Sequence, residues 1–261
     1  MIRPFASTAC GLVVAAVVAT SMPATAFEHA IIGADAPPLD IAHWLQDREG
    51  AFKPVKEFTP GKVYVIEFWA TWCGPCIMSM PHLAELQDAY ADKGVTVIGV
   101  SDEKVEDVRG FLEQQTPDVQ ATYGEITKKY CLTIDPDGSV HKDYMAAAQE
   151  GGVPTAFIVG KTGKIEWIGH PDTIDEPLES IVAGTWDRTS FVADEKELDA
   201  MGQAIQMALQ GPDPQQAIPL MDQLIAGAKR PGVKRRLEQA KAHIAEIVAA
   251  MAASKKQAGD Q

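Results

Sequence analysis

The sequence predicts an α/β fold, in which a central sheet is flanked by helices, followed by an all-helical extension. Two observations support this class. Up to about residue 188, short apolar runs alternate with segments of helical periodicity, which is typical of a sheet covered by helices. Beyond residue 188 only helical periodicity remains, interrupted by turns rich in Gly and Pro. The chain has 261 residues, of which 46% are hydrophobic, enough for one sizeable core and an appendage.

The N-terminal segment is typical of a secretory signal peptide. Arg3 precedes an apolar run over residues 9–19, and Ala24-Thr25-Ala26 resembles a cleavage site. We therefore expect residues 1–26 to be removed and the mature chain to be periplasmic. An uncleaved membrane anchor is the alternative, although the run is short for a bilayer span. Loss of Arg3, the only charged residue of the segment, changes the formal charge from −13 to −14, which disfavours nucleic-acid binding.

The first predicted elements form a β-α-β unit and an inserted α-β unit. We expect a buried strand over residues 63–69 and a helix from about residue 74 to Gly94, with a kink at Pro81. The helical spacing rests on four side chains predicted to face the core, namely Met78, Leu83, Leu86 and Tyr90. A strand over residues 95–100, a helix over residues 105–115 and a strand over residues 131–134 follow.

A β-β-α unit completes the predicted domain, which spans residues 27–188. A short helix over residues 140–149 leads into this unit. The unit itself consists of a hairpin with strands at residues 155–159 and 165–168, and a last helix over residues 174–184.

Residues 189–261 form the predicted helical extension. Asp194, with Glu197 three positions later, resembles a capping box. Helices are expected to run to about residue 209, over 215–228 and over 232–254, with disorder from about residue 255. The last helix is amphipathic, because Leu237, Ile244, Val248 and Met251 fall on one face. We expect this face to pack on the α/β domain; partner docking or oligomerisation through residues 189–261 is the alternative.

Two thiols stand one helical turn apart in Trp72-Cys73-Gly74-Pro75-Cys76, directly after a predicted buried strand. A helix N-terminus carries unpaired N–H groups and the positive end of the macrodipole, so a thiolate there is stabilised and nucleophilic. CxxC also occurs in zinc sites, haem attachment sites and structural disulfides. A zinc site needs a second pair of ligands, and the sequence has no second CxxC or closely spaced His pair. Haem attachment needs a His directly after the second Cys, whereas Ile77 follows Cys76. The motif therefore favours redox chemistry without a metal or another cofactor.

Two other residues are given structural roles. Cys131 lies in an apolar run, and we expect it to be a buried free thiol rather than a third redox thiol. His82 follows Pro81 on the predicted helix and is expected at the surface, because a lone histidine is weak evidence of function.

Several motifs resemble the thioredoxin superfamily. They are Phe68-Trp69-Ala70-Thr71-Trp72-Cys73-Gly74-Pro75-Cys76, Pro81 and Gly152-Val153-Pro154-Thr155. The leading peptide, the inserted segment and Gly163-Lys164-Ile165 are similar to exported thiol:disulfide oxidoreductases of the TlpA and ResA type. The resemblance covers about residues 33–186 and implies a thioredoxin-like fold with a mixed central sheet. The helical extension is not a general feature of that family.

The resemblance implies a role for each residue around the thiol pair. Cys73 is expected to be the exposed nucleophile that forms a mixed disulfide with a substrate, and Cys76 to resolve it, leaving a Cys73–Cys76 disulfide. Pro154 resembles the cis-proline that faces the thiols and presents Val153 for pairing with the substrate. Further residues of the implied site are Trp72 and Thr155 for substrate binding, and Trp72, Gly74 and Pro75 for tuning the redox potential.

Glu67 is a carboxylate within an apolar strand, at a position where thioredoxins place a buried Asp. A buried carboxyl group is costly to ionise, so its pKa should be raised. It would then accept the proton of Cys76 during resolution, through a water molecule. In the alternative, Glu67 points to solvent near the end of the strand.

The predicted function is that of a periplasmic protein-disulfide reductase. Gly-Pro between the cysteines is the dipeptide of thioredoxin, whose potential of about −270 mV lies far below that of DsbA at about −120 mV. The resemblance implies a membrane thiol-electron donor of the DsbD or CcdA type, and protein substrates with cysteine pairs, such as apocytochrome c or copper-site proteins. An oxidase or isomerase of the same fold, or a binding module docking through the C-terminal helices, is the alternative. A peroxidase is disfavoured, because Ile66 and Ala70 replace the Pro and Thr of Pro-x-x-x-Thr-x-x-Cys.

Overall fold

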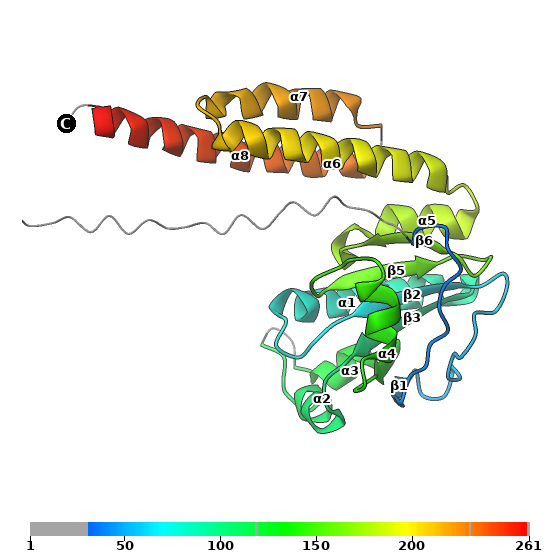
Figure 1. Cartoon of the computed structure of the whole chain (residues 1–261). Helices are drawn as coiled ribbons and strands as arrows, with labels where there is room; N and C mark the ends of the chain where they lie inside the picture. Colours follow the sequence, from blue (N-terminus) through cyan, green and yellow to red (C-terminus); the bar gives the residue numbers. More distant parts are fainter. Residues whose placement is uncertain (1–30, 118–119, 230, 260–261) are drawn as a thin grey trace, which may run out of the picture.

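The computed structural model describes residues 31–117, 120–229 and 231–259. An α/β body is followed by three long helices that lie together and project away from the sheet (Figure 1). The predicted signal peptide, its cleavage site and Cys10 lie outside the described residues. Among the helices that are described, none combines the length and the apolar character needed to cross a membrane.

Six strands form one mixed sheet in the order β1-β4-β3-β2-β5-β6. The central strands β2 (Val63–Phe68), β3 (Val95–Ser101) and β4 (Cys131–Ile134) are parallel. The predicted hairpin is present: β5 (Thr155–Val159) runs antiparallel to β2, and β6 (Ile165–Gly169) antiparallel to β5. β1 (His43–Asp47) pairs antiparallel with β4 at one edge. The sequence does not predict β1, because its apolar residues are adjacent rather than alternating.

Helices cover both faces of the sheet. They are α1 (Gly74–Tyr90), α2 (Val105–Leu112), α3 (Tyr123–Thr127), α4 (Ser139–His141), a π-helical turn over Lys142–Ala146, and α5 (Asp175–Ala183). Short 3-10 turns occur at Ala91–Lys93, Pro171–Thr173 and Pro214–Gln216. α3 is not predicted from the sequence, because its five residues, held by a capping box of Thr122 and Glu125, are too few to show periodicity. The predicted helix over residues 140–149 is shorter than expected and partly π-helical.

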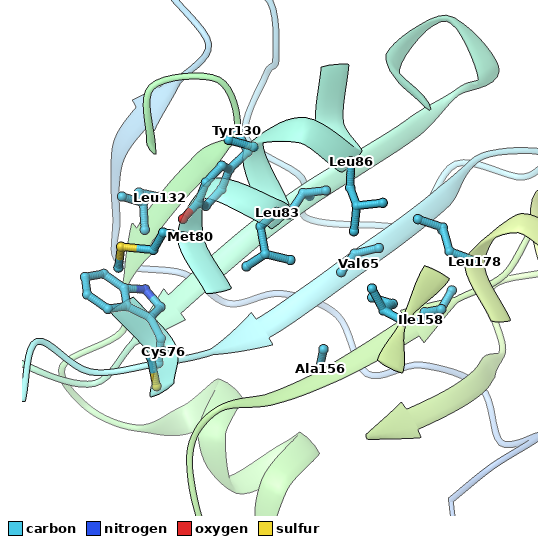
Figure 2. Close-up of a cluster of buried hydrophobic side chains, with 14 of the residues drawn as sticks. Val65, Cys76, Met80, Leu83, Leu86, Tyr130, Leu132, Ala156, Ile158 and Leu178 are labelled. Carbon is cyan, nitrogen blue, oxygen red and sulfur yellow. The ribbon is translucent and has the colours of Figure 1, made fainter. Parts of the chain in front are cut away.

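Residues of β2 alternate between two cores on opposite faces of the sheet. Val63 and Val65 face the core that contains side chains of α1, α2 and α5, whereas Ile66 and Phe68 face a second core under α4. Figure 2 shows the first core, where Leu83 of α1 meets the sheet. Burial of apolar surface, worth about 25 cal/mol per Å², holds α1 on the sheet. The N-terminus of α1 is thereby fixed close to the carboxyl end of β2.

One prediction about α1 is wrong. Met78 is 75% exposed, because it lies away from the face on which Leu83 is buried. α1 continues through Pro81 as a single helix. It is further fixed by the buried Gln87, which donates to the Val95 carbonyl at 3.0 Å and accepts from the Val97 N–H at 2.7 Å.

The C-terminal helices are α6 (Arg188–Gln210), α7 (Ala217–Gly227) and α8 (Pro231–Gly259). The cap of α6 is Asp187, which accepts hydrogen bonds from the N–H and the hydroxyl of Ser190 at 3.1 and 2.7 Å. The capping box predicted at Asp194 is therefore wrong, since Asp194 lies inside the helix. α8 extends to Gly259, past residue 255, from which the sequence predicts disorder.

The three C-terminal helices have a core of their own. Its buried residues are Ile205, Ala217, Met221, Leu224 and Val248, with Leu237 and Ile244 packed against them. At the start of α6, Phe191 instead joins the first core of the α/β body and lies beside Trp186. The expectation that the apolar face of the last helix packs on the α/β domain is therefore wrong for Leu237, Ile244 and Val248, which pack with residues of α6 and α7, whereas Met251 on the same face is 40% exposed.

Candidate active site

Cys73 and Cys76 form a disulfide at the N-terminus of α1. Cys73 is the N-cap residue with an extended backbone, and its Sγ accepts a hydrogen bond from the Cys76 N–H at 3.2 Å. Pro75 lies in the first helical turn, where its missing N–H leaves no bond unmade. The sulfur of Cys73 is therefore placed where backbone N–H groups and the helix dipole favour negative charge.

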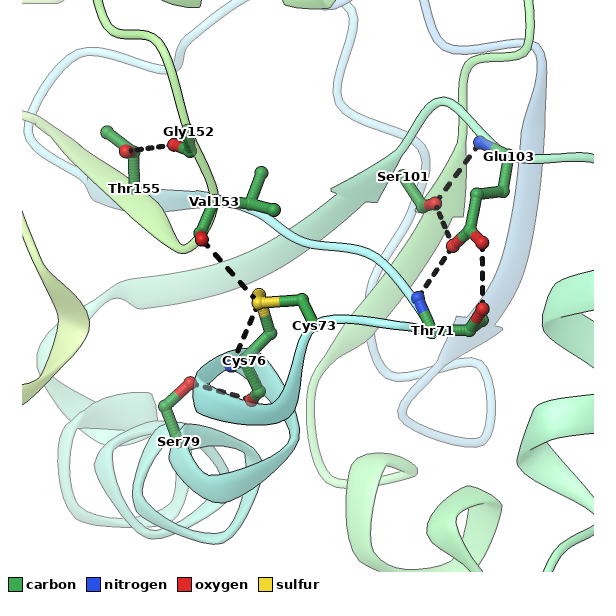
Figure 3. Close-up of a disulfide and its surroundings, with 9 residues drawn as sticks. All are labelled: Thr71, Cys73, Cys76, Ser79, Ser101, Glu103, Gly152, Val153 and Thr155. Carbon is green, nitrogen blue, oxygen red and sulfur yellow. Dashed lines mark hydrogen bonds between the residues drawn. A yellow bond between two sulfur atoms is a disulfide. The ribbon is translucent and has the colours of Figure 1, made fainter. Parts of the chain in front are cut away.

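The loop before β5 faces the disulfide (Figure 3). The Val153–Pro154 peptide bond in this loop is cis, and the Val153 carbonyl oxygen lies 3.5 Å from the Sγ of Cys73. The loop is closed by Thr155, whose hydroxyl donates to the Gly152 carbonyl at 2.8 Å. The structure thus brings the Val153 carbonyl to the sulfur of Cys73, and Pro154 and Thr155 follow Val153 in the same loop.

The residues of the CxxC segment differ in exposure. Trp72 is 75% exposed, whereas Cys73 is 4% exposed and Cys76 is fully buried. Cys73 is less exposed than the sequence suggests, because the loop before β5 covers it. Gly74 faces solvent, and a Cβ at this position would meet no atom within 4 Å.

A cavity of about 330 Å³ opens beside the disulfide. Trp72 and Val153 line it, and its polar wall includes Asp102, His141 and Glu150. Neither cysteine lines the cavity; it adjoins Cys73 through its sequence neighbour Trp72 and through Val153, whose carbonyl oxygen is 3.5 Å from the Cys73 sulfur.

Glu67 is buried in the middle of the sheet, with 2% of its surface exposed. Its strand neighbours are Gly99 on β3 and Ala156 on β5, which have little or no side chain. Alternation along β2 places Glu67 on the same face as Val65, in the core that contains Cys76. The Oε1 of Glu67 has no hydrogen-bond partner among the described residues, and burial raises the pKa of Glu67 to about 8. The alternative in which Glu67 points to solvent is excluded.

Sequence reasoning misses Glu103, which follows the end of β3. Its carboxylate accepts hydrogen bonds from the Thr71 N–H and the Thr71 hydroxyl, both at 2.7 Å (Figure 3). No sequence motif marks this residue. The available signal is its position, because polar residues just beyond the carboxyl ends of parallel strands often line functional sites.

The remaining predicted residues lie away from the disulfide. Cys131 is buried and free, as predicted, and burial raises the pKa of its thiol to about 12. His82 is only partly exposed, since its Nε2 lies 3.2 Å from a carboxylate oxygen of Asp175 on α5. Within the described parts of the chain, no three His, Cys, Asp or Glu side chains are placed to hold a metal ion.

Comparisons with known proteins agree with this geometry. The model of the AhpC/TSA family matches residues 32–168, which include the CxxC segment and the cis-proline loop. Protein FixW of Rhizobium leguminosarum is 27% identical over 155 residues, covering 59% of this chain and 67% of FixW. The thiol-disulfide oxidoreductase ResA of Bacillus thuringiensis is 33% identical over 135 residues, covering 51% of this chain and 66% of ResA. The chain thus spans about two thirds of the length of these relatives.

Solved structures match the chain at low similarity. A thiol:disulfide interchange protein of the thioredoxin family from Chlorobium tepidum is 19% identical, with a TM-score of 0.43, and the match covers 57% of this chain and 97% of that one. The family match spans more than half of the chain and contains the disulfide at the helix N-terminus. The chain therefore belongs to the AhpC/TSA family within the thioredoxin superfamily, and is similar to the thiol-disulfide oxidoreductase ResA.

Proposed function

We propose that the protein is a periplasmic protein-disulfide reductase that acts through Cys73 and Cys76. The observation that carries this proposal is the position of the Cys73 sulfur. It accepts the Cys76 N–H at 3.2 Å at the start of α1, which stabilises a thiolate, and it lies 3.5 Å from the Val153 carbonyl, beside which a substrate chain can lie.

Reduction proceeds in two exchange steps. The Cys73 thiolate attacks one sulfur of a substrate disulfide, and the other substrate sulfur leaves as a thiolate that takes up a proton. Cys76 then loses its proton and attacks the Cys73 sulfur of the mixed disulfide. The Cys73–Cys76 disulfide forms and the substrate leaves as a dithiol, so that two electrons have passed to the substrate. In this proposal Trp72, Val153, Pro154 and Thr155 bind the substrate segment, while Trp72, Gly74 and Pro75 tune the potential.

Glu67 is the proposed acceptor of the Cys76 proton, through a water molecule. Its pKa, raised by burial to about 8, is close to the value of about 8.5 for an ordinary thiol. Proton transfer between groups of matched pKa is nearly balanced in free energy, and the acceptor is the ionised form of Glu67, which with this pKa makes up about a tenth of the molecules at pH 7. The unpartnered Oε1 of Glu67 is free to take the hydrogen bond that such a transfer needs.

A reductase in an oxidising compartment needs a source of electrons. We propose a membrane thiol-electron donor of the DsbD or CcdA type, and protein substrates with cysteine pairs, such as apocytochrome c or copper-site proteins. The similarity to ResA and the predicted signal peptide support this placement.

The equilibrium potential of the Cys73–Cys76 couple tests the direction of electron flow. Because Gly74-Pro75 is the dipeptide of thioredoxin, we expect a potential near about −270 mV when the full-length protein is equilibrated with glutathione buffers. A potential above about −150 mV would instead favour an oxidase or isomerase.

The C-terminal helices are expected to be dispensable for the chemistry, because they have a separate core. A chain that ends after Ala193 keeps Phe191 in the first core and should reduce insulin within about twofold of the full-length rate. Size-exclusion chromatography with light scattering, run in parallel, tests whether residues 194–261, the part of the helical extension that this chain lacks, mediate oligomerisation. If this shortened chain folds but no longer reduces insulin, the expectation that the C-terminal helices are dispensable for the chemistry is contradicted.

A further inference from the structure

Glu103 holds the loop that carries the nucleophile. Its Oε2 accepts the Thr71 N–H and its Oε1 accepts the Thr71 hydroxyl, each at 2.7 Å. The carboxylate is itself oriented by Ser101, whose hydroxyl donates to Oε2 at 3.1 Å and accepts the Glu103 N–H at 3.2 Å (Figure 3). Both carboxylate oxygens are therefore engaged, and distances of 2.7 Å are typical of charge-assisted hydrogen bonds.

The loop between β2 and α1 is also fixed at its start, where Trp69 and Ala70 are buried and the Trp69 N–H donates to the Val100 carbonyl at 3.1 Å. Thr71 is followed by Trp72, whose side chain is 75% exposed and cannot fix the loop by burial. The turn is closed by the Cys73 N–H, which donates to the Ala70 carbonyl at 3.1 Å. The Glu103 carboxylate thus binds Thr71, two residues before Cys73, and connects the turn to the end of β3.

The position of this turn determines where Cys73 caps the helix. The Sγ of Cys73 accepts the Cys76 N–H at 3.2 Å only while the chain enters α1 at the present angle. We infer that Glu103 is a positioning residue for the redox reaction: through Thr71, it holds Cys73 where the helix N-terminus stabilises the thiolate and where the sulfur faces Val153. This inference rests on the proposed function only where it is tested by the rate of attack on a protein disulfide.

Two substitutions of Glu103 separate position from charge. Glu103→Gln removes the charge but keeps both contacts, because its Oε1 accepts the Thr71 N–H and its Nε2 donates to the Thr71 hydroxyl oxygen. Glu103→Ala removes both contacts. We expect Glu103→Ala to slow attack on insulin by about tenfold and to raise KM, since small misplacement of a reacting group is costly, whereas Glu103→Gln stays within about twofold of the wild type.

The readout that a purely structural role would not move is the pH profile of Cys73 alkylation. Reduced full-length protein is treated with iodoacetamide over a pH series, and Cys73 modification is followed by peptide mass spectrometry. We expect the midpoint to move to higher pH in Glu103→Ala and not in Glu103→Gln, because loss of the cap hydrogen bond weakens the thiolate. Glu106→Ala, which removes an exposed carboxylate of α2, is the matched control and should behave like the wild type.

Thr71→Val keeps the test decisive if Glu103→Ala does not fold. It removes only the hydroxyl partner and should shift both readouts in the same direction by a smaller amount, and add nothing to Glu103→Ala in the double variant. The inference is overturned if Glu103→Ala and Thr71→Val keep the wild-type midpoint and attack rate, or if Glu103→Gln is as impaired as Glu103→Ala. Alkylation needs no protein substrate, so it still reports on Glu103 if the wild-type protein fails to reduce insulin and the proposed function fails.

Discussion

Cys73→Ser is expected to lower insulin reduction by more than about a thousandfold, because neither of the other two thiols in the described part of the chain can take over the attack. Cys76 is fully buried in the first core, and the thiol of Cys131 is buried with its pKa raised to about 12. Cys76→Ser should behave differently: attack by Cys73 continues but resolution stops, so a mixed disulfide with the substrate accumulates. Non-reducing electrophoresis and intact-protein mass spectrometry measure this adduct.

The matched control for both variants is Cys131→Ala, which also removes one cysteine. Because Cys131 lies in the second core, away from the disulfide, insulin reduction should stay within about twofold of the wild type. A mixed disulfide that accumulates in Cys73→Ser rather than in Cys76→Ser would reverse the proposed roles of the two cysteines.

Glu67→Gln is expected to stabilise the oxidised protein at neutral and alkaline pH. In the folded protein the pKa of Glu67 is raised to about 8, from an ordinary value of 4.5, by burial. Between these values the folded protein retains a proton that the unfolded chain has released. Stability therefore falls by about 1.4 kcal/mol per pH unit as pH rises from 4.5 towards 8, which amounts to ~3 kcal/mol at pH 7. The full stability is present below pH 4.5.

Urea denaturation of wild type and Glu67→Gln at pH 4, 6, 7 and 8 measures this dependence. The two proteins should be similar at pH 4 and should diverge in favour of Glu67→Gln by about 1–3 kcal/mol at pH 7, the burial of an amide offsetting part of the gain. Glu106→Gln, at an exposed site, should show no such divergence. Parallel pH curves for wild type and Glu67→Gln would contradict a buried, protonated Glu67.

Glu67→Gln also tests the proposed proton acceptor. Stopped-flow measurement of single turnovers should show slower resolution of the mixed disulfide with unchanged attack by Cys73, since only resolution requires removal of the Cys76 proton. Equal rates for both steps in the two proteins would remove Glu67 from the mechanism while leaving its effect on stability intact.

The central elements of the fold are readable in the sequence because each is a long apolar run or ends at a strong turn signal. β2, β3 and the β5–β6 hairpin are of this kind. β1 has adjacent rather than alternating apolar residues and α3 has only five residues, too few to show a helical period, so tertiary contacts decide their conformation. Periodicity also shows that α8 buries a face without showing its partner, which is why its packing on α6 and α7 could not be foreseen.

The site divides in the same way. Cys73, Cys76 and Pro154 stand in contiguous motifs, so the sequence identifies them. Glu103 contacts Thr71 across 32 positions of sequence, and nothing local distinguishes it from other acidic residues of the chain. The burial of Glu67 is only partly predictable from the sequence. Its apolar strand indicates burial, but the space for the side chain comes from the neighbouring Gly99 and Ala156, which the sequence does not place beside it.

The separate core of the C-terminal helices has a practical consequence for spectroscopy. All five tryptophans and all five tyrosines of the chain precede residue 188, so intrinsic fluorescence above 300 nm has no emitter in the extension. Circular dichroism at 222 nm, in contrast, receives a large contribution from α6, α7 and α8. Two bodies that have separate cores need not melt together. A melting temperature obtained by fluorescence therefore describes the redox domain, and one obtained by circular dichroism describes a weighted mixture of both bodies.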